Sequence, residues 1–278
     1  MSDRPLVSAQ WLHEHLEDDD VRVIDTSWHM PASGRNSLTE YARQHIPGAV
    51  FFDLDRHSSP SDLPHMMPSA EQFSEVVGQL GISDTHRIVV YDSLGLFSAA
   101  RLWWMFRHFG ARKVFVLDGG LPAWQAAGYP TDSDTPAPVA TAYRIEGDGF
   151  SVADSAQVLE ASQSGNRLVL DARSQARFLG EEKEARPGLR SGHVPGSKSM
   201  PFTELLDNGF LKSNDELREI LGRRGVNTDS AVITTCGSGV TAAVISLALE
   251  CIGVSDVALY DGSWTEWGAL QEMPVVSS

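Results

Sequence analysis

Cysteine is scarce in this chain, which has only Cys236 and Cys251 among its 278 residues. Two cysteines without a framework spacing exclude a disulfide scaffold and a zinc ribbon, and they favour a reducing compartment. A basic-then-apolar leader and an apolar run of transmembrane length are also missing. We therefore expect a cytoplasmic enzyme that works without a membrane and without a metal.

Positive charge is the second shortage. Lys and Arg number 22 against 37 Asp and Glu, which gives a net charge of −15 at pH 7. Such an excess of negative charge argues against nucleic acid or an anionic membrane surface as a partner. An anionic substrate would need a local cationic site that works against the overall field.

What the chain has is an internal repeat. Four short motifs of the first half recur in the second at offsets of 143 to 148 residues. The matching segments are Val23–Thr26 and Leu168–Arg173, His45–Ala49 and His193–Ser197, Ile88–Asp92 and Val232–Cys236, and Val116–Gly120 and Leu259–Ser263. A period this long indicates two duplicated domains, which agrees with a length about twice that of a common domain.

The polar, proline-bearing stretch 131–138 predicts a linker. We therefore expect a first domain over 1–130, a linker over 131–150 and a second domain over 151–278. In each half, short apolar strands alternate with helices, which we expect at Ala70–Leu80, Ala99–Phe109 and Asn214–Arg224. The alternation predicts an α/β fold in which each domain has a mostly parallel sheet flanked by helices on both faces. Ligands of such sheets bind outside the carboxyl ends of the strands.

Cys236 stands at such a strand end. The apolar, β-branched segment 231–235 predicts a buried strand, and the Ala-, Leu- and Ile-rich segment 241–250 predicts a helix. Gly237 and Gly239 let the intervening loop curl, so that its N–H groups and the helix N-terminus can stabilise an anion at their focus. We expect that anion to be the cysteine thiolate, the reactive form. The alternative, a small buried hydrophobic residue, is our expectation for the other cysteine.

Tandem halves, two His-x-Pro-Gly turns and a Cys-Gly-Ser-Gly-Val-Thr loop in the second half alone resemble the two-domain rhodanese superfamily. The resemblance covers nearly the whole chain. It implies two rhodanese-like domains, of which the second carries the nucleophile and the first is catalytically silent. Asp92 takes the place of the cysteine in the first half, in agreement with a silent domain. The resemblance implies no metal and no organic cofactor.

Within that superfamily the loop resembles the mercaptopyruvate branch. Thiosulfate-using members carry a basic Cys-Arg-Lys-Gly-Val-Thr loop, whereas this chain has Gly237 and Ser238 in place of the two cations. Phosphatases of the same fold end their loop with an arginine, which is also missing here. The resemblance implies transfer of sulfur from 3-mercaptopyruvate to a thiol, such as reduced thioredoxin, or to cyanide. The sulfur would travel as a persulfide on Cys236, cradled by the backbone N–H groups of Gly237, Ser238, Gly239, Val240 and Thr241.

A small keto acid needs a planar cation for its carboxylate. Arg177 and Arg186 match the substrate-binding arginine pair of the superfamily, and Arg173 and Arg190 are nearby competitors. The alternative for this segment is a solvated loop, because the charge run 181–184 between the pair needs no function.

The first half offers a second set of candidate residues. Segment 51–68 resembles the family segment that places an aspartate and a histidine near the cysteine, together with the loop serine. Carried over, this proton-relay set is Asp55, His65 and Ser238. Asp53 is an alternative to Asp55.

Other motifs of the repeat predict turns. We expect structural roles for the two His-x-Pro-Gly elements, which contain His45 and His193, and for Asp118–Gly120 and Asp261–Ser263.

Two further functions stay open. A thiosulfate:cyanide sulfurtransferase would differ in its sulfur donor. A non-catalytic rhodanese-like module would bind a partner or sense redox state without forming a persulfide. The intact loop, the arginine pair and the Asp/His set favour the enzyme.

Overall fold

The computed structural model describes residues 4–145 and 149–277, and the chain divides into two compact units. The first unit holds the N-terminal residues up to Ser59, Met67–Gly149 and the short piece Asn208–Leu211. The second unit holds Pro60–Met66, Phe150–Asp207 and Lys212–Ser278. A segment that contains His65 thus belongs to the unit built mainly from the other half of the sequence.

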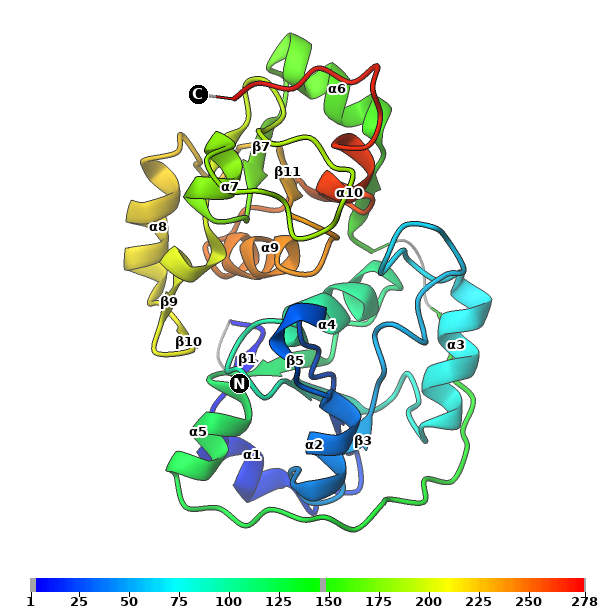
Figure 1. Ribbon diagram of the computed structural model, residues 1–278. Helices are drawn as coiled ribbons and strands as arrows, with labels where there is room; N and C mark the ends of the chain where they lie inside the picture. The colour runs from blue at the N-terminus through cyan, green and yellow to red at the C-terminus, as the bar shows by residue number, and fades with distance from the viewer. Residues whose placement is uncertain (1–3, 146–148, 278) are drawn as a thin grey trace. The chain divides into compact units, whose positions relative to one another are not determined.

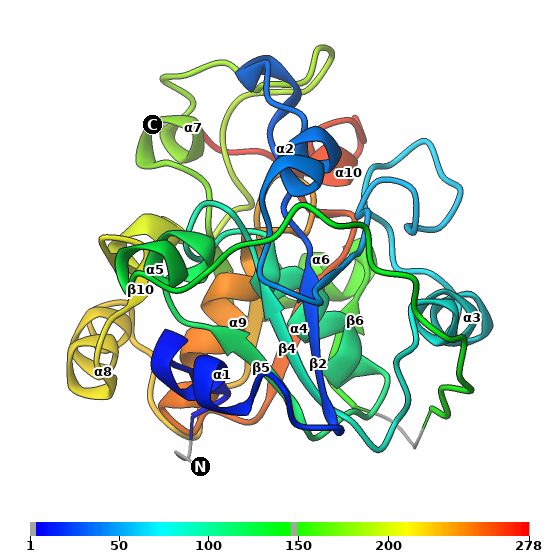
Figure 2. The same cartoon turned by 90° about the horizontal axis from the view of Figure 1, so that it is seen from below.

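The first unit contains a parallel sheet with the strand order β1-β5-β4-β2-β3. Its strands are β1 (Leu6–Val7), β2 (Val21–Asp25), β3 (Val50–Phe51), β4 (Arg87–Tyr91) and β5 (Val114–Leu117). Its helices are α1 (Ala9–His15), α2 (Ser37–Arg43), α3 (Ala70–Gln79), α4 (Ala99–His108) and α5 (Gly120–Ala126), with a 3-10 turn η1 at Pro31–Ser33. Helices α1 and α5 lie side by side in both views (Figures 1 and 2).

The second unit repeats this arrangement with the strand order β6-β12-β11-β7-β8, again parallel. Its strands are β6 (Ser151–Ala153), β7 (Leu168–Asp171), β8 (Lys198–Ser199), β11 (Val232–Thr235) and β12 (Val257–Tyr260). Its helices are α6 (Ser155–Ser164), α7 (Gln175–Leu179), α8 (Asn214–Gly222), α9 (Ala242–Cys251) and α10 (Ser263–Trp267), with a 3-10 turn η2 at Phe202–Leu205. Strand β9 (Leu206–Asp207) belongs to the second unit, and strand β10 (Phe210–Leu211) belongs to the first. The matching strand orders confirm the duplication and the α/β fold.

Both faces of the second sheet are covered, which is why its strands are almost continuously apolar. Val169, Ile233 and Ala258 pack on one face in a cluster with α6 and α10. Thr234 points the other way, and its Oγ1 lies 3.0 Å from Ser246 Oγ of α9. Helix α9 runs beside β11 and β12 on that face (Figure 1). Because β7 and β11 pair along their whole length, their carboxyl ends lie next to each other.

The expected helices are confirmed as α3, α4 and α8, each slightly shorter at its C-terminal end. Ser69 and Ser213 begin α3 and α8 with capping boxes, which a serine three residues before Gln or Glu predicts. The helix expected from Thr241 begins one residue later, with Thr241 as its N-cap. Within the residues that the structure describes, every helix is too short or too polar to pass through a lipid bilayer.

The two His-x-Pro-Gly elements are structural, as expected. The Nδ1 atom of His45 lies 2.7 Å from the carbonyl oxygen of Tyr41, and the two rings stack. In the second unit, His193 Nδ1 lies 2.8 Å from the carbonyl oxygen of Phe178, again with stacked rings. Each histidine therefore ties its turn to a neighbouring helix.

Candidate active site

Cys236 lies directly after β11, at the carboxyl end of the strand, and it is buried. Its backbone is held on both sides. The N–H donates to Ser263 Oγ at 3.2 Å, and the carbonyl accepts the N–H of Trp264 at 3.0 Å. Cys236 and Cys251 are not joined in a disulfide, and Cys251 is buried within α9, as expected for a small core residue. Of the two, only Cys236 stands where parallel sheets bind their ligands.

The loop after Cys236 offers donors for an anion. Gly239 has a φ of +76°, a left-handed conformation that glycine adopts without strain. Its N–H donates to Ser263 Oγ at 3.1 Å, so the expectation that all five loop N–H groups face the sulfur is not met by Gly239. In the described part of the chain, the other four loop N–H groups have no hydrogen-bond acceptor, those of Gly237, Ser238, Val240 and Thr241.

Ser263 is a residue of this site that the motif analysis missed. The assignment of 261–263 to a turn is correct for the backbone, but the buried Ser263 hydroxyl also supports the loop. Its Oγ donates to the carbonyl of Tyr260 at 2.8 Å and accepts the two loop N–H groups just described. Its φ of +48° is rare for a residue with a side chain. The repeat held a signal, since the first half has Gly120 at this position and only the half with the cysteine has a hydroxyl.

The structure brings His65 and Ser238 together although 173 residues separate them in the sequence. His65 Nδ1 lies 2.9 Å from Ser238 Oγ, and both residues are buried. His65 has a φ of +60°, which a bulky residue keeps only where surrounding contacts hold it. A proton can pass between the imidazole and the hydroxyl through this contact, which is the task expected of these two relay residues.

Asp55, the third expected relay residue, belongs to the first unit. Both of its carboxylate oxygens lie 3.1 Å from Trp28 Nε1, which donates to them. Asp53, the alternative, accepts the N–H groups of Asp55 and Arg56 and so closes a local turn. The geometry gives Asp53 a structural task, and the relay role of Asp55 stays a prediction.

Arg177 is an oriented cation beside the loop. It lies in the last turn of α7, and its side chain is 21% exposed. A Cβ built on Gly237 would lie 3.3 Å from Arg177 Nη2, so the glycine leaves the space that the guanidinium needs. The Nε atom of Arg177 donates to Glu184 Oε2 at 3.2 Å, and Nη2 donates to the same oxygen.

The two competing arginines are structural. The Arg173 side chain has no exposed surface and forms ion pairs with Asp171 and Glu184. Burial disfavours its charge, but the two carboxylates outweigh burial and raise the pKa of Arg173. Arg190 donates to four backbone carbonyls in segment 267–273. Neither guanidinium is placed to receive a substrate.

The charge run between Arg177 and Arg186 is only partly solvated. Residues 181–183 are exposed, as expected, but the Glu184 side chain is only 2% exposed. The alternative of a solvated charge run is therefore wrong at Glu184, whose side chain is buried. Arg186 follows two residues later and is half-buried, and its role as the second substrate arginine stays a prediction.

Comparison with known families agrees with this geometry. The family model for a rhodanese-like domain matches the chain twice, over residues 8–127 and 154–270. The chain belongs to the rhodanese family. Each match includes the central strands of one sheet, so each unit is a rhodanese domain around its own parallel sheet.

Known rhodanese proteins are similar over almost the whole chain. The 3-mercaptopyruvate sulfurtransferase of Escherichia coli (strain K12) is 44% identical over 279 residues, which is 99% of this chain and 99% of that protein. The thiosulfate sulfurtransferase of Cricetulus griseus is 43% identical over 273 residues, 95% of this chain and 92% of that protein. The crystal structure of SseA from Escherichia coli, described as a 3-mercaptopyruvate sulfotransferase, has a TM-score of 0.84 at 42% identity and covers 94% of this chain and 99% of that chain. One relative is named for 3-mercaptopyruvate and another for thiosulfate, and both are almost equally similar to this chain. Sequence identity alone therefore does not decide which of the two compounds is the sulfur donor.

In the first rhodanese domain, the Asp92 side chain occupies the loop that corresponds to the Cys236 loop. Asp92 follows β4 as Cys236 follows β11. Its carboxylate accepts three backbone N–H groups at 2.7 to 2.9 Å, those of Leu94, Phe97 and Ala99. The anion at the focus of this loop is therefore part of the chain itself, and the loop presents no nucleophile.

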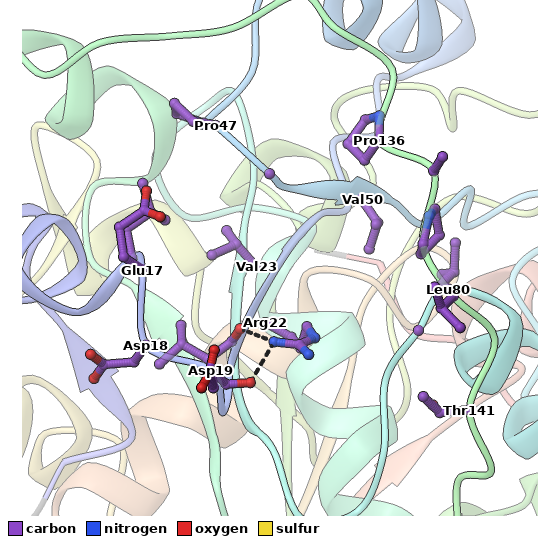
Figure 3. A pocket seen from close by; sticks show the side chains of 17 residues that line it. Glu17, Asp18, Asp19, Arg22, Val23, Pro47, Val50, Leu80, Pro136 and Thr141 are labelled. Carbon is purple, nitrogen blue, oxygen red and sulfur yellow. Dashed lines mark hydrogen bonds between the residues drawn. The ribbon is translucent and has the colours of Figure 1, made fainter.

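Two of the cavities in the described part of the first unit lie at the ends of β2 and have neither Cys nor His in their lining. One of about 260 Å³ lies at the carboxyl end of β2 and is lined in part by Asp25 and Arg35. The other, of about 510 Å³, lies at the amino end of β2, where Arg22 Nη1 donates to the carbonyls of Asp19 and Val21 (Figure 3). Neither cavity has the groups that sulfur transfer needs.

Among residues 4–145 and 149–277, no three His, Cys, Asp or Glu side chains are grouped to hold a metal ion.

Proposed function

We propose that this chain is a sulfurtransferase that takes sulfur from 3-mercaptopyruvate, holds it as a persulfide on Cys236 and passes it to a thiol. One arrangement carries the proposal: a cysteine at a strand end, loop N–H groups that have no acceptor in the described residues, and Arg177 packed against Gly237. The names of the E. coli relative and of SseA support this type of reaction.

The charge of the site favours 3-mercaptopyruvate as the donor. The loop 236–241 contains no cation, and Arg177 already shares its charge with Glu184. Such a site suits a single carboxylate better than the dianion of thiosulfate. Thiosulfate is the second candidate donor, since a relative with that name is 43% identical.

In the first half-reaction, Arg177 and Arg186 hold the carboxylate and the keto oxygen of the donor. The Cys236 thiolate attacks the donor sulfur, and an S–S bond forms while the C–S bond breaks. The electron pair of the C–S bond moves into the enolate of pyruvate, whose charge the arginines and the loop N–H groups stabilise. A proton from His65, or from a water held by Ser238, completes pyruvate.

In the second half-reaction, a thiol such as reduced thioredoxin, or cyanide, attacks the outer sulfur and regenerates the Cys236 thiolate. The scheme uses neither a metal nor an organic cofactor. We assign the nucleophile Cys236 to the second domain, 151–278, and Asp55 and His65 to the first domain, 1–130, which has no nucleophile of its own. Residues 131–150 are the proposed linker, and the cytoplasm is the proposed location. Asp55 is kept as the third relay residue on the resemblance of segment 51–68.

Mass spectrometry and kinetics together test the proposal. Incubation with 3-mercaptopyruvate and no acceptor should add one sulfur atom at Cys236 and release pyruvate. With an acceptor, kcat/KM for 3-mercaptopyruvate should exceed that for thiosulfate by at least about tenfold. Cys251→Ser, a matched change at the other cysteine, should behave as the wild type does.

The other outcomes separate the alternatives. A preference for thiosulfate would identify the second candidate function. A wild-type protein that gains no sulfur from either donor would refute the proposal and support a non-catalytic module.

A further inference from the structure

Glu184 connects Arg173 and Arg177, whose contacts lead to the catalytic loop. Its side chain is only 2% exposed, and each carboxylate oxygen has its own partner. Arg173 Nη1 donates to Oε1 at 2.6 Å, and Arg177 donates to Oε2 through Nε and Nη2. A charge is buried this deeply at acceptable cost only where it is paired and hydrogen-bonded, as both oxygens of Glu184 are here.

The contacts of Glu184 continue on both sides to the loop. On one side, the Arg173 guanidinium lies 4.1 Å from the centre of the Trp264 ring, and the backbone N–H of Trp264 donates to the carbonyl of the catalytic cysteine. On the other side, Arg177 Nη2 lies against Gly237. Glu184 therefore closes a ring of contacts that begins and ends on two neighbouring loop residues.

The way Glu184 binds Arg177 leaves one edge of the guanidinium for a ligand. Oε2 engages Nε and one N–H of Nη2, which leaves Nη1 and the second N–H of Nη2. Within the described residues, Nη1 has no hydrogen-bond partner, and the side chain keeps its 21% exposure. The remaining edge is the pair of parallel donors that binds a carboxylate bidentately.

We propose that Glu184 is a positioning residue for Arg177, which it holds in the orientation that offers this edge to the carboxylate of the sulfur donor. The inference rests on the proposed function. Glu184 touches neither the donor nor the reacting sulfur. Arg173, which is fixed in turn by Asp171 through an Nη2–Oδ2 contact of 2.6 Å, keeps the Glu184 carboxylate in place. Without Glu184, the flexible Arg177 side chain would have to be ordered by the ligand on binding.

Glu184→Gln keeps the size of the side chain and removes its charge. We expect KM for 3-mercaptopyruvate and Kd for pyruvate to rise about tenfold or more, because the ligand must then order Arg177. Inorganic polysulfide, a donor without a carboxylate, should load Cys236 within about twofold of the wild-type rate. Glu181→Gln, the same change at an exposed residue of the same run, should leave all three values unchanged.

A double-mutant cycle with Arg177→Gln separates positioning from general support of the fold. If Glu184 acts through Arg177, adding Glu184→Gln to Arg177→Gln should change Kd for pyruvate by less than about twofold. The proposal is overturned if Glu184→Gln raises Kd for pyruvate as much in the Arg177→Gln protein as in the wild type. It is also overturned if KM and Kd are unchanged in the Glu184→Gln single variant. Glu184→Asp, a charged side chain one methylene shorter, should lie between wild type and Glu184→Gln, and it serves as the test if the latter does not fold.

The proposed function and this inference fail in different ways. A wild-type protein that binds pyruvate but gains no sulfur from 3-mercaptopyruvate refutes the proposed function, and the pyruvate cycle still decides the role of Glu184. A wild-type protein that does both, with a Glu184→Gln variant equal to it, refutes the inference alone.

Discussion

The two halves of the chain use the same strand end in opposite ways. After β4, the Asp92 carboxylate accepts three N–H groups of its own loop, whereas after β11 four loop N–H groups have no acceptor in the described residues. The frame is shared, because the carbonyls of Asp92 and Cys236 accept the N–H groups of Leu121 and Trp264, both at 3.0 Å. A loop of this shape favours an anion at its centre in both halves. The first half supplies that anion from its own side chain, and in the second half we propose that the place is taken by sulfur on Cys236.

The neighbouring strand ends differ as well. Asp171, at the end of β7, is ion-paired with Arg173, and the first half has Ser27 at the position of that arginine. Asp25, at the end of β2, accepts the N–H of Ser27 at 2.8 Å, and burial raises the pKa of Asp25 to about 6. The same strand end thus holds an ion-paired carboxylate in the second half and, in the first half, a carboxyl group that stays protonated to a higher pH than usual.

Exchanging the nucleophile is the strongest test of this difference. Cys236→Ser should lower turnover at least about a thousandfold and abolish the mass increase of one sulfur, because a hydroxyl forms no persulfide. Asp92→Asn, at the equivalent position, should keep turnover within about twofold. Pyruvate release and mass spectrometry measure both. Sulfur retained by Cys236→Ser, or turnover lost in Asp92→Asn, would contradict the division between the halves.

Removing the internal anion should destabilise the first half. Asp92→Ala leaves three loop N–H groups without their acceptor, and we expect the free energy of unfolding to fall by about 3–5 kcal/mol. Asp92→Asn keeps one acceptor oxygen and should lose about half as much. Urea denaturation followed by tryptophan fluorescence gives both values. An Asp92→Ala protein as stable as the wild type would show that this loop needs no anion.

The pH dependence of stability should report Asp25. Its pKa is about 6 in the native state against 3.8 for the ordinary group, so between these values the native protein binds more protons than the unfolded chain. The contribution of Asp25 to stability is therefore present at low pH and falls by up to about 3 kcal/mol as pH rises from about 4 to about 6.

Asp25→Asn lacks this titration and isolates its effect. The stability of the variant relative to the wild type should rise over the same pH range. Urea denaturation at several pH values measures the difference. A difference that stays constant with pH would show that Asp25 titrates alike in both states.

A smaller effect is expected where the halves differ by one hydroxyl. Ser263 and Gly120 share left-handed backbone, with φ of +48° and +55°. Ser263→Ala keeps that conformation and removes the acceptor of two loop N–H groups, so we expect a loss of about 1–2 kcal/mol. Ser263→Gly relieves the backbone and should lose less than about 1 kcal/mol. Equal losses in the two variants, measured by urea denaturation, would show that the backbone conformation contributes nothing.

Local patterns were enough to predict the architecture. Apolar strands buried on both faces and serine-capped helices are readable from neighbouring residues, and so is the position of Cys236 between β11 and α9. The resemblance to the rhodanese superfamily supplied His65 and Arg177. The contact of His65 with Ser238 could not come from spacing, because 173 residues separate the two.

The sequence by itself determined the duplicated fold and predicted Cys236 as the nucleophile, because both depend on residues that are close together in the chain. Only the tertiary structure decided which polar groups surround that nucleophile. Glu184 resembles the exposed Glu181 in sequence, and Ser263 resembles any turn serine. Glu184 and Ser263 differ from such residues because folding brings two arginines to the Glu184 carboxylate and two loop N–H groups to the Ser263 hydroxyl. A buried polar group is stable only with such partners, which lie 7 and 11 residues away for Glu184 and 24 and 27 residues away for Ser263.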